Sequence, residues 1–246
     1  MRLDKALTFM GLTRSQARRA VADGRVRVNG LTVRDAGMAV SPGDVSLDGA
    51  EIAAAGELTL MLNKPAGLIT ATRDRAVPTV MDLLPENLAN RSLGPVGRLD
   101  KDVTGLVLLT TDGQLAHRLI SPRRHVEKVY LAHVEGDMDE NALAAIRAGG
   151  LEFSDFVSKP AGAEIVGPGA VRLTLTEGKF HEVKRICARV GHPVLCLKRL
   201  SIAGVELDPA LVEGMFRELT LSEARRLYAA AGMDMPQIAP DDPKRR

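Results

Sequence analysis

The most continuous hydrophobic stretch in the middle of the chain follows a strongly charged loop. Leu106–Leu109 contains no polar position, which predicts a buried strand. The charged loop Gly97–Gly105 precedes this strand, and Asp112 follows it, in position to cap a helix over Gln114–Ile120. Asp100 is therefore tethered to a rigid element, where a carboxylate can be aimed at a ligand.

The other apolar positions divide the chain into short strands and helices. Apolar runs bounded by Gly, Pro or Asp predict strands, and apolar residues at helical spacing predict helices. The expected strands are Leu58–Leu62, Leu106–Thr110, Val129–Val134, Val171–Thr176, Val194–Ile202 and Phe216–Leu219. The further helices expected are Asn141–Ala148, Glu182–Val190 and Ser222–Ala231. This mixture of strands and helices belongs to the α+β class.

The first 48 residues form a smaller predicted unit. Apolar residues at helical spacing from Leu3 to Met10 predict one helix. A second helix begins after Thr13, which forms a capping-box pattern with Gln16. The pair Asn29-Gly30 predicts a hairpin. We therefore expect an α-rich domain at 1–48, a linker at 49–57, a larger domain at 58–234 and a disordered tail at 235–246.

Composition limits the functions that this chain can have. Of the 246 residues, 45% are hydrophobic, so the chain can bury a substantial core. Two cysteines do not make a disulfide framework, and the Cys and His spacing does not fit a zinc site. No signal peptide and no apolar run of membrane-spanning length occurs. We expect a cytoplasmic monomer that holds no metal and does not bind a membrane.

The net charge of +2 hides an uneven distribution of charge. Residues 1–34 carry eight Arg and Lys against two Asp, a local charge of +6, and the rest of the chain carries −4. Positive charge of this density is typical of a surface that binds nucleic-acid phosphates. The alternative is a solvated helix face, but the charges are segregated rather than alternating in sign, which favours RNA binding.

This basic segment resembles the small RNA-binding domain named after ribosomal protein S-four of the small subunit. The motifs that carry the resemblance are Arg2-Leu3-Asp4-Lys5-Ala6-Leu7, Thr13-Arg14-Ser15-Gln16-Ala17, Gly24-Arg25-Val26-Arg27-Val28-Asn29-Gly30 and Pro42-Gly43-Asp44. In that family the second helix and the turn after it contact RNA. The resemblance therefore implies phosphate contacts by Arg14, Arg18, Arg19, Arg25 and Arg27.

Four motifs of the larger domain resemble the RsuA-type pseudouridine synthases, which convert uridine in RNA to its C-glycoside isomer. They are Asn63-Lys64-Pro65-Ala66-Gly67, the loop Gly97–Gly105, Glu127-Lys128-Val129-Tyr130 and Thr176–Arg185. The resemblance covers essentially the whole chain and implies a catalytic domain built on a mixed, largely antiparallel sheet with flanking helices. It implies that Asp100 is the catalytic residue, that Tyr130 stacks on the target base and that Lys184 pairs with the aspartate. Substrate binding is expected from Arg98, Lys64, Val183 and Arg185.

These residue types suit the chemistry of that reaction. Breaking the N-glycosidic bond needs a nucleophile or an electrostatic stabiliser near the ribose, and an ionised carboxylate serves as either. A neighbouring cation favours the ionised carboxylate. A tyrosine face can stack on the released uracil while the ring rotates, and the target must first leave its own stack. Attack at C1′ of the ribose and attack at C6 of the base both remain open, and neither requires a cofactor.

Two of the proposed roles have rivals nearby in the sequence. Asp102 lies two positions after Asp100 on a strand-like loop, so spacing alone does not choose between them. The family motif selects Asp100, which leaves Asp102 to cap or bond the turn that follows. Arg185 is the rival for the role of Lys184, and His181 is expected to order its turn rather than to transfer protons.

The last of the four motifs, Thr176–Arg185, helps to predict which ribosomal RNA is the substrate. Large-subunit relatives more often carry Asn-Arg where this chain has Phe180-His181, which favours the small-subunit branch, whereas Glu182 and Ile186 depart from the expected Gln and Met. We assign no role to Phe180. The expected substrate is one uridine of 16S ribosomal RNA, in free RNA or in a partly assembled small subunit. The alternatives are a 23S ribosomal RNA synthase and a non-catalytic S-four-like RNA-binding protein.

Overall fold

The computed structural model describes residues 2–10, 12–40, 44–51, 57–89 and 92–236, which form two compact units. The first unit comprises the chain up to Leu58 together with Leu84–Leu93, and the second comprises Thr59–Leu83 and Gly94–Met235. We expected Leu84–Leu93 in the larger domain, but the Ser92 hydroxyl bonds to Thr8 of the first unit at 2.7 Å. Most of the predicted linker, residues 52–56, and the predicted tail from 237 onward lie outside the described residues.

The first unit combines short helices with a small sheet. Its helices are α1 (Leu3–Ala6), η1 (Leu7–Met10), α2 (Arg14–Ala22) and α3 (Glu86–Ala89). Its strands are β1 (Val26–Val28), β2 (Leu31–Thr32), β3 (Val45–Leu47) and β4 (Ala50–Glu51), in the antiparallel order β2-β1-β3-β4. Helical residues outnumber strand residues among the described residues of this unit, so the expected α-rich domain is confirmed, and β4 occupies the start of the predicted linker.

Local signals in the first unit are confirmed by its hydrogen bonds. The Thr13 hydroxyl accepts from the amide of Gln16 at 3.2 Å, and the Gln16 side chain accepts from the amide of Thr13 at 2.8 Å. Asn29 and Gly30 have φ angles of 49° and 79°, as the two central residues of a type I′ turn require. One helix was predicted from Leu3 to Met10, but its second half is a 3₁₀-helix.

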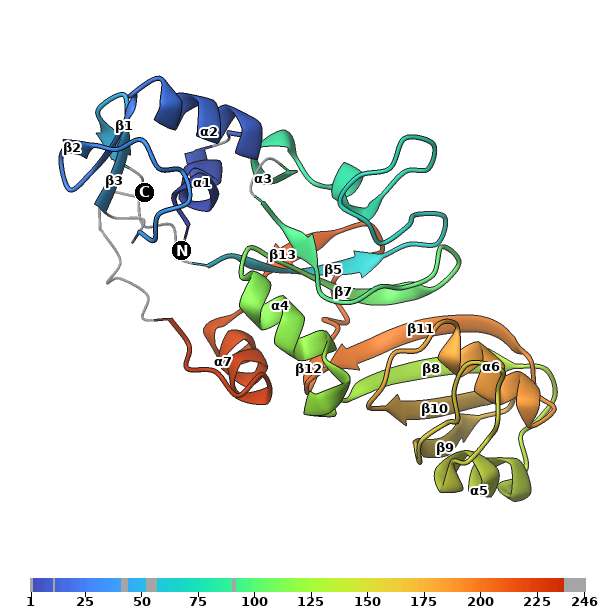
Figure 1. Ribbon diagram of the computed structural model, residues 1–246. Helices are drawn as coiled ribbons and strands as arrows, with labels where there is room; N and C mark the ends of the chain where they lie inside the picture. Colours follow the sequence, from blue (N-terminus) through green and yellow to red (C-terminus); the bar gives the residue numbers. More distant parts are fainter. Residues whose placement is uncertain (1, 11, 41–43, 52–56, 90–91, 237–246) are drawn as a thin grey trace. The chain divides into compact units, whose positions relative to one another are not determined.

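The second unit is built on one sheet of nine strands (Figure 1). Its main order is β13-β5-β7-β11-β8-β10-β9, with β6 paired to β7 and β12 to β11. The strands are β5 (Thr59–Lys64), β6 (Gly94–Pro95), β7 (Thr104–Thr110), β8 (Lys128–Val134), β9 (Gly162–Gly167), β10 (Ala170–Leu175), β11 (Val194–Ile202), β12 (Val205–Glu206) and β13 (Phe216–Glu218). All pairings are antiparallel except that of β7 with β11, so the expected mixed, largely antiparallel sheet is confirmed.

All six predicted strands are present, and β11 has the predicted bounds. The predicted helices correspond to α4 (Gly113–Ile120), α5 (Glu140–Ala148), α6 (Glu182–Arg189) and α7 (Leu221–Ala230). The sequence pattern missed β9, because this strand lies at the sheet edge and most of its residues are exposed. It also missed the short elements η3 (Val80–Leu83) and η4 (Pro122–Arg124).

Helices α4 and α7 lie side by side and cover one face of the sheet (Figure 1). Leu106 and Leu108 of β7 pack in one core with Leu115 of α4 and Leu227 of α7. The Asp112 carboxylate caps α4 as predicted, because it accepts from the amides of the two residues that follow Gly113 at 2.9 and 3.0 Å. Its second oxygen accepts from the hydroxyl of Tyr228 at 2.9 Å, so one carboxylate joins both helices.

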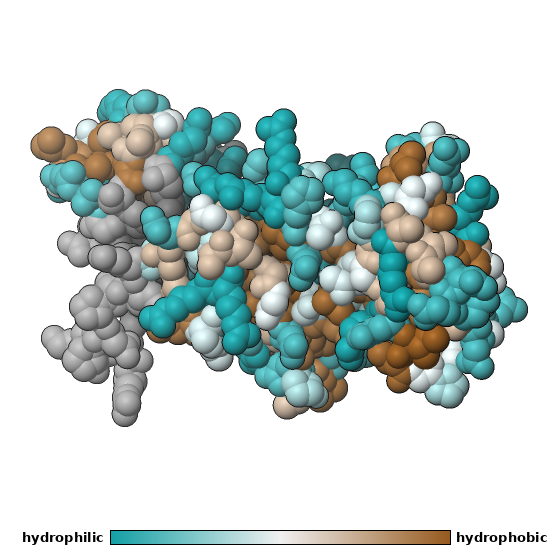
Figure 2. Space-filling model, turned by 90° about the horizontal axis from the view of Figure 1, so that it is seen from below, coloured by the Kyte–Doolittle hydropathy of each residue, from teal (hydrophilic) through white to brown (hydrophobic). Residues whose placement is uncertain are grey.

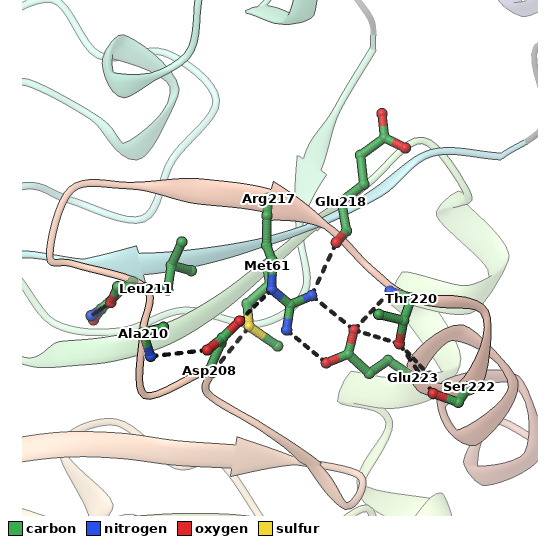
Figure 3. A network of polar contacts seen from close by, with 10 residues as sticks. Met61, Asp208, Ala210, Leu211, Arg217, Glu218, Thr220, Ser222 and Glu223 are labelled. Atoms are coloured by element: carbon green, nitrogen blue, oxygen red, sulfur yellow. Dashed lines mark hydrogen bonds and ion pairs between the residues drawn. The ribbon is translucent and has the colours of Figure 1, made fainter.

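A polar network fastens the start of α7 to β13 (Figure 3). The guanidinium of Arg217 donates to Asp208 at 2.8 Å and to both oxygens of Glu223 at 2.8 and 2.9 Å. Hydrogen bonds from Arg217 hold the pKa of Glu223 down, at about 2. Glu223 also forms a capping box with Thr220. The network fixes the helix that covers the core of the second unit.

The outer surface is mainly hydrophilic on the face drawn in Figure 2, where brown apolar patches are interrupted by teal side chains. Within the described ranges, no helix is long and apolar enough to cross a membrane.

Candidate active site

The loop that carries Asp100 is held by backbone contacts on both sides of this residue. The Thr70 hydroxyl donates to the carbonyl of Leu99 at 2.9 Å and accepts from the Leu99 amide at 3.0 Å. The amide of Gly67 donates to the carbonyl of Lys101 at 2.8 Å. Because Thr70 and Leu99 are both buried, the neighbouring carboxylate projects from a fixed backbone.

Lys64 holds the backbone of this loop and is not accessible to a substrate. Its side chain is fully buried, and the ammonium donates to the carbonyls of Pro65, Lys101 and Val103 at 3.0, 3.2 and 2.7 Å. Burial lowers the pKa of Lys64 to about 8. The expectation that Lys64 contacts substrate does not fit this environment; the residue instead positions the loop that carries Asp100.

Gly105 allows β11 to approach the end of the loop. Its φ is +97°, and a Cβ at this position would lie 2.3 Å from the carbonyl oxygen of Arg199. Arg199 is almost fully buried, and its Nε donates to the carbonyl of Leu106 at 2.8 Å. Its Nη2 has no hydrogen-bond partner among the described residues. The sequence offered no signal for Arg199, because its position depends on the pairing of β7 with β11.

Two carboxylates of the loop, those of Asp100 and Asp102, contact the same lysine. The Lys184 ammonium lies 3.1 Å from Oδ2 of Asp100, and 2.7 and 2.9 Å from the two oxygens of Asp102. The side chain of Asp102 is 73% exposed and that of Asp100 only 28%. Burial opposes charge on Lys184, but hydrogen bonds to Asp102 and Asp100 raise its pKa overall. The expectation that Asp102 caps or bonds its turn is wrong, since its carboxylate binds Lys184.

His181 lies on the other side of the Asp100 carboxylate, at 3.5 Å from Nε2 to Oδ1. Its backbone is left-handed, with φ of 52°, and it directly precedes α6. We expected His181 to order this turn, but its side chain forms no capping hydrogen bond to α6. The carboxylate of Glu182 orders the turn instead, by accepting from the Lys179 amide at 2.9 Å.

One cavity gathers most of the predicted site residues. It holds about 480 Å³ of space not filled by protein atoms, and part of this space is open solvent. Its lining includes Arg98, Asp100, Tyr130, Val183 and Lys184. A neighbouring cavity shares the first three of these residues and adds Lys128, Phe180 and Arg199.

Tyr130 is placed in the cavity by its strand. It lies on β8, where it pairs with Leu173 of β10 and with Arg199 of β11. Directly opposed residues share one face of a sheet, so Tyr130 and Arg199 point to the same side. Tyr130 is 9% exposed, so only a small part of it is open to the cavity.

Arg185 does not line the cavity around Asp100. Its Nη2 lies 2.5 Å from a carboxylate oxygen of Asp155, and its guanidinium packs 4.9 and 4.7 Å from the ring centroids of Phe153 and Phe156. The expectation that Arg185 binds substrate or replaces Lys184 does not fit this location. It anchors α6 to the segment before β9.

The arginines of the first unit form a separate exposed group, comprising Arg14, Arg18, Arg19, Arg25 and Arg27. Three of them pair with aspartates: Arg18 lies 3.4 Å from Asp4, Arg19 lies 3.9 Å from Asp23, and Arg25 bonds Asp48. Within the described part of the chain, Arg14 and Arg27 form no ion pair. All five keep donors facing solvent, as phosphate contact requires.

The comparisons with known proteins agree with this architecture. The family model for RNA pseudouridylate synthase matches residues 58–189, and the S4 domain model matches residues 1–46. The chain belongs to the RNA pseudouridylate synthase family and carries an S4 domain ahead of its synthase domain. The family and the small RNA-binding domain expected from the sequence motifs are therefore confirmed.

Individual relatives are similar over nearly their whole length. The ribosomal small subunit pseudouridine synthase A of Escherichia coli K12 is 43% identical, covering 91% of this chain and 98% of its own. An uncharacterized RNA pseudouridine synthase of Bacillus subtilis, YtzG, is 41% identical, covering 92% of this chain and 98% of its own. A crystal structure of a pseudouridylate synthase is 40% identical and superposes with a TM-score of 0.67, over 92% of this chain and 99% of that one.

Proposed function

We propose that this protein converts one uridine of 16S ribosomal RNA to pseudouridine, with Asp100 as the catalytic carboxylate. The observation that carries the proposal is the partly exposed carboxylate of Asp100, held 3.1 Å from Lys184 in a cavity that also contains Tyr130. The choice of 16S RNA is supported by relatives at 41–43% identity that are named ribosomal small subunit pseudouridine synthase A.

The geometry holds the Asp100 carboxylate from two sides. Lys184 and His181 contact different oxygens of Asp100, at 3.1 and 3.5 Å. The buried contacts of Lys64 and Thr70 fix the backbone of the loop before RNA binds. The carboxylate therefore meets the target nucleotide without a reorganisation of its own backbone.

The reaction breaks the bond between C1′ and N1 of uridine and forms a bond between C1′ and C5. The proton on C5 then leaves to solvent and N1 takes up a proton, so the product is an isomer of uridine. Tyr130 presents a ring face on which the uracil stacks during its rotation. Arg98, exposed at the cavity, binds a phosphate of the extruded nucleotide. Val183 forms an apolar wall beside Lys184. Attack by Asp100 at C1′ and at C6 both fit this arrangement.

The S4 domain supplies affinity for the RNA backbone. Its exposed arginines contact phosphates without reading sequence, which positions the RNA for the synthase domain. The RNA is free or part of an incompletely assembled small subunit, and the enzyme acts as a monomer in the cytoplasm.

The test is release of tritium from RNA transcribed with uridine labelled at C5. We expect release from 16S RNA with the native protein and none with Asp100→Asn, at nearly unchanged RNA affinity. Asp102→Asn is the matched control and should keep the rate within about tenfold, because an exposed ion pair contributes at most about 1 kcal/mol. Substantial activity in Asp100→Asn would remove this residue from the catalytic role.

Pseudouridine mapping of both ribosomal RNAs, from cells lacking this protein, tests the substrate. Loss of one 16S site supports the proposal. Loss of a 23S site instead keeps the enzyme and overturns the substrate. Intact modification at all sites would favour a protein that binds ribosomal RNA without modifying it.

A further inference from the structure

Phe180 is an exposed aromatic side chain next to the active-site cavity. It is 71% exposed, and among the Phe and Tyr side chains that the structure describes it is the only one in an exposed position. Single exposed apolar residues are common on protein surfaces, so the surroundings of Phe180 decide what its exposure means.

The ring of Phe180 is stacked on a residue that contacts Asp100. The ring centroids of Phe180 and His181 are 3.7 Å apart, with 20° between the planes. The His181 ring reaches Asp100, 3.5 Å from Nε2 to Oδ1. The two rings therefore form one continuous surface that begins at the Asp100 carboxylate and ends in solvent.

The backbone holds this ring pair in place. His181 has φ of +52°, a left-handed conformation that is costly for a residue with a side chain. Hydrogen bonds between Lys179 and Glu182 close the turn, and Nη1 of Arg185 donates to the carbonyl of Phe180 at 3.4 Å. A strained conformation kept by several contacts, with an apolar ring left exposed, is typical of a ligand-binding segment.

The charge of the cavity beside Phe180 indicates the chemistry of that ligand. The lining contains one carboxylate, that of Asp100. It also contains five cationic side chains: Arg98, Lys101, Lys128, Lys179 and Arg199. An exposed aromatic face next to concentrated positive charge suits a nucleotide, whose base stacks and whose phosphate is anionic.

We propose that the Phe180–His181 pair is a stacking platform for the base of a nucleotide adjacent to the target uridine. This proposal rests on the proposed function. Tyr130 is almost buried and is reached only by a base that enters the cavity, whereas Phe180 is open to a base that stays outside. When the target uridine leaves its stack, its neighbour loses a stacking partner. Phe180 replaces that partner.

The test combines protein variants with RNA that lacks one base. The substrate is a fragment of ribosomal RNA around the mapped target, intact or with an abasic nucleotide at either neighbouring position. The proteins are native, Phe180→Ala, Phe180→Leu and Phe180→Tyr, with Leu195→Ala as the control. Leu195 is similarly exposed, at 67%, and lies in neither lining. Dissociation constants and single-turnover rates of pseudouridine formation are measured for each pair.

Loss of one base–aromatic stack corresponds to a roughly 5- to 150-fold weaker Kd. We expect this loss for Phe180→Ala and Phe180→Leu on intact RNA, and recovery for Phe180→Tyr. One abasic RNA should bind the native protein equally weakly and should lose nothing further with Phe180→Ala. The proposal would be refuted if the abasic RNA and Phe180→Ala weakened binding separately and additively, or if Phe180→Leu bound RNA as the native protein does. A native protein that modifies no RNA would instead refute the proposed function.

Discussion

Replacing Gly105 by alanine tests how closely β7 and β11 approach beside the candidate site. The added Cβ would lie 2.3 Å from the carbonyl oxygen and 2.8 Å from the amide nitrogen of Arg199, both of which belong to the backbone. Neither atom can rotate away, so the two strands must separate where they pair in parallel. The φ of +97° adds strain of its own.

The magnitude follows from these two contributions. A non-glycine residue at a positive φ costs on the order of 1–3 kcal/mol, and forcing extra volume into a packed interior costs about 1–3 kcal/mol or more. We expect Gly105→Ala to lower the free energy of unfolding by about 2–6 kcal/mol, the sum of the two contributions. Gly214 is the matched control, because its φ is +86° but no atom lies within 4 Å of an added Cβ. Gly214→Ala should therefore cost only the strain, about 1–3 kcal/mol.

Urea unfolding monitored by tyrosine fluorescence measures the difference in stability between these two variants, and it reports on the structural unit that contains Gly105. The chain has no Trp, and its two tyrosines, Tyr130 and Tyr228, both lie in the second unit, as does Gly105. An unchanged slope of the free energy against urea shows that the same surface is exposed on unfolding. Equal destabilisation by Gly105→Ala and Gly214→Ala would refute the close approach of the two strands.

Two further predictions concern charge. The pKa of Lys64 is lowered by burial from 10.5 to about 8, so from pH 8 to 10.5 the unfolded chain binds more protons there than the native one. In urea unfolding across this window, the stability of the native protein should therefore rise relative to Lys64→Met, by at most about 1.4 kcal/mol per pH unit; a constant difference would show that this pKa is not lowered. The second prediction concerns the S4 domain and the variant in which Arg14, Arg18 and Arg19 are all replaced by Gln. The binding constant for ribosomal RNA, measured at several salt concentrations, should depend less steeply on salt in this variant, by roughly 2–3 in the slope of log K against log salt. An unchanged slope would exclude phosphate contacts by these three arginines.

Features that depend on neighbouring residues could be predicted well. The capping box of Thr13 and Gln16, the cap at Asp112 and the Asn29-Gly30 turn involve groups within a few positions of one another. Their geometry is set by short stretches of backbone, so residue type and spacing suffice. The edge strand β9 was missed because it buries little, and without burial the alternation of apolar and polar residues is lost.

The candidate site was predictable as a set of residues but not as an arrangement. Asp100, Tyr130 and Lys184 were named from motifs, and the structure places all three in one cavity. Lys64 and Arg185 were also named, but neither lies there. The conformation of a long basic side chain depends on the residues that pack around it, and the spacing of a motif does not specify those residues.

The sequence by itself determined the helices and main strands, the segregation of positive charge and the candidate residues for the chemistry. Tertiary structure alone decided which atoms meet. Lys184 joins Asp102 across 82 positions of sequence, and Arg199 bonds Leu106 across 93. Contacts over such distances arise from the order of strands in the sheet, which local periodicity does not encode. Exposure follows from the same order, and it leaves Lys64 buried beneath the Asp100 loop and Phe180 in solvent beside it.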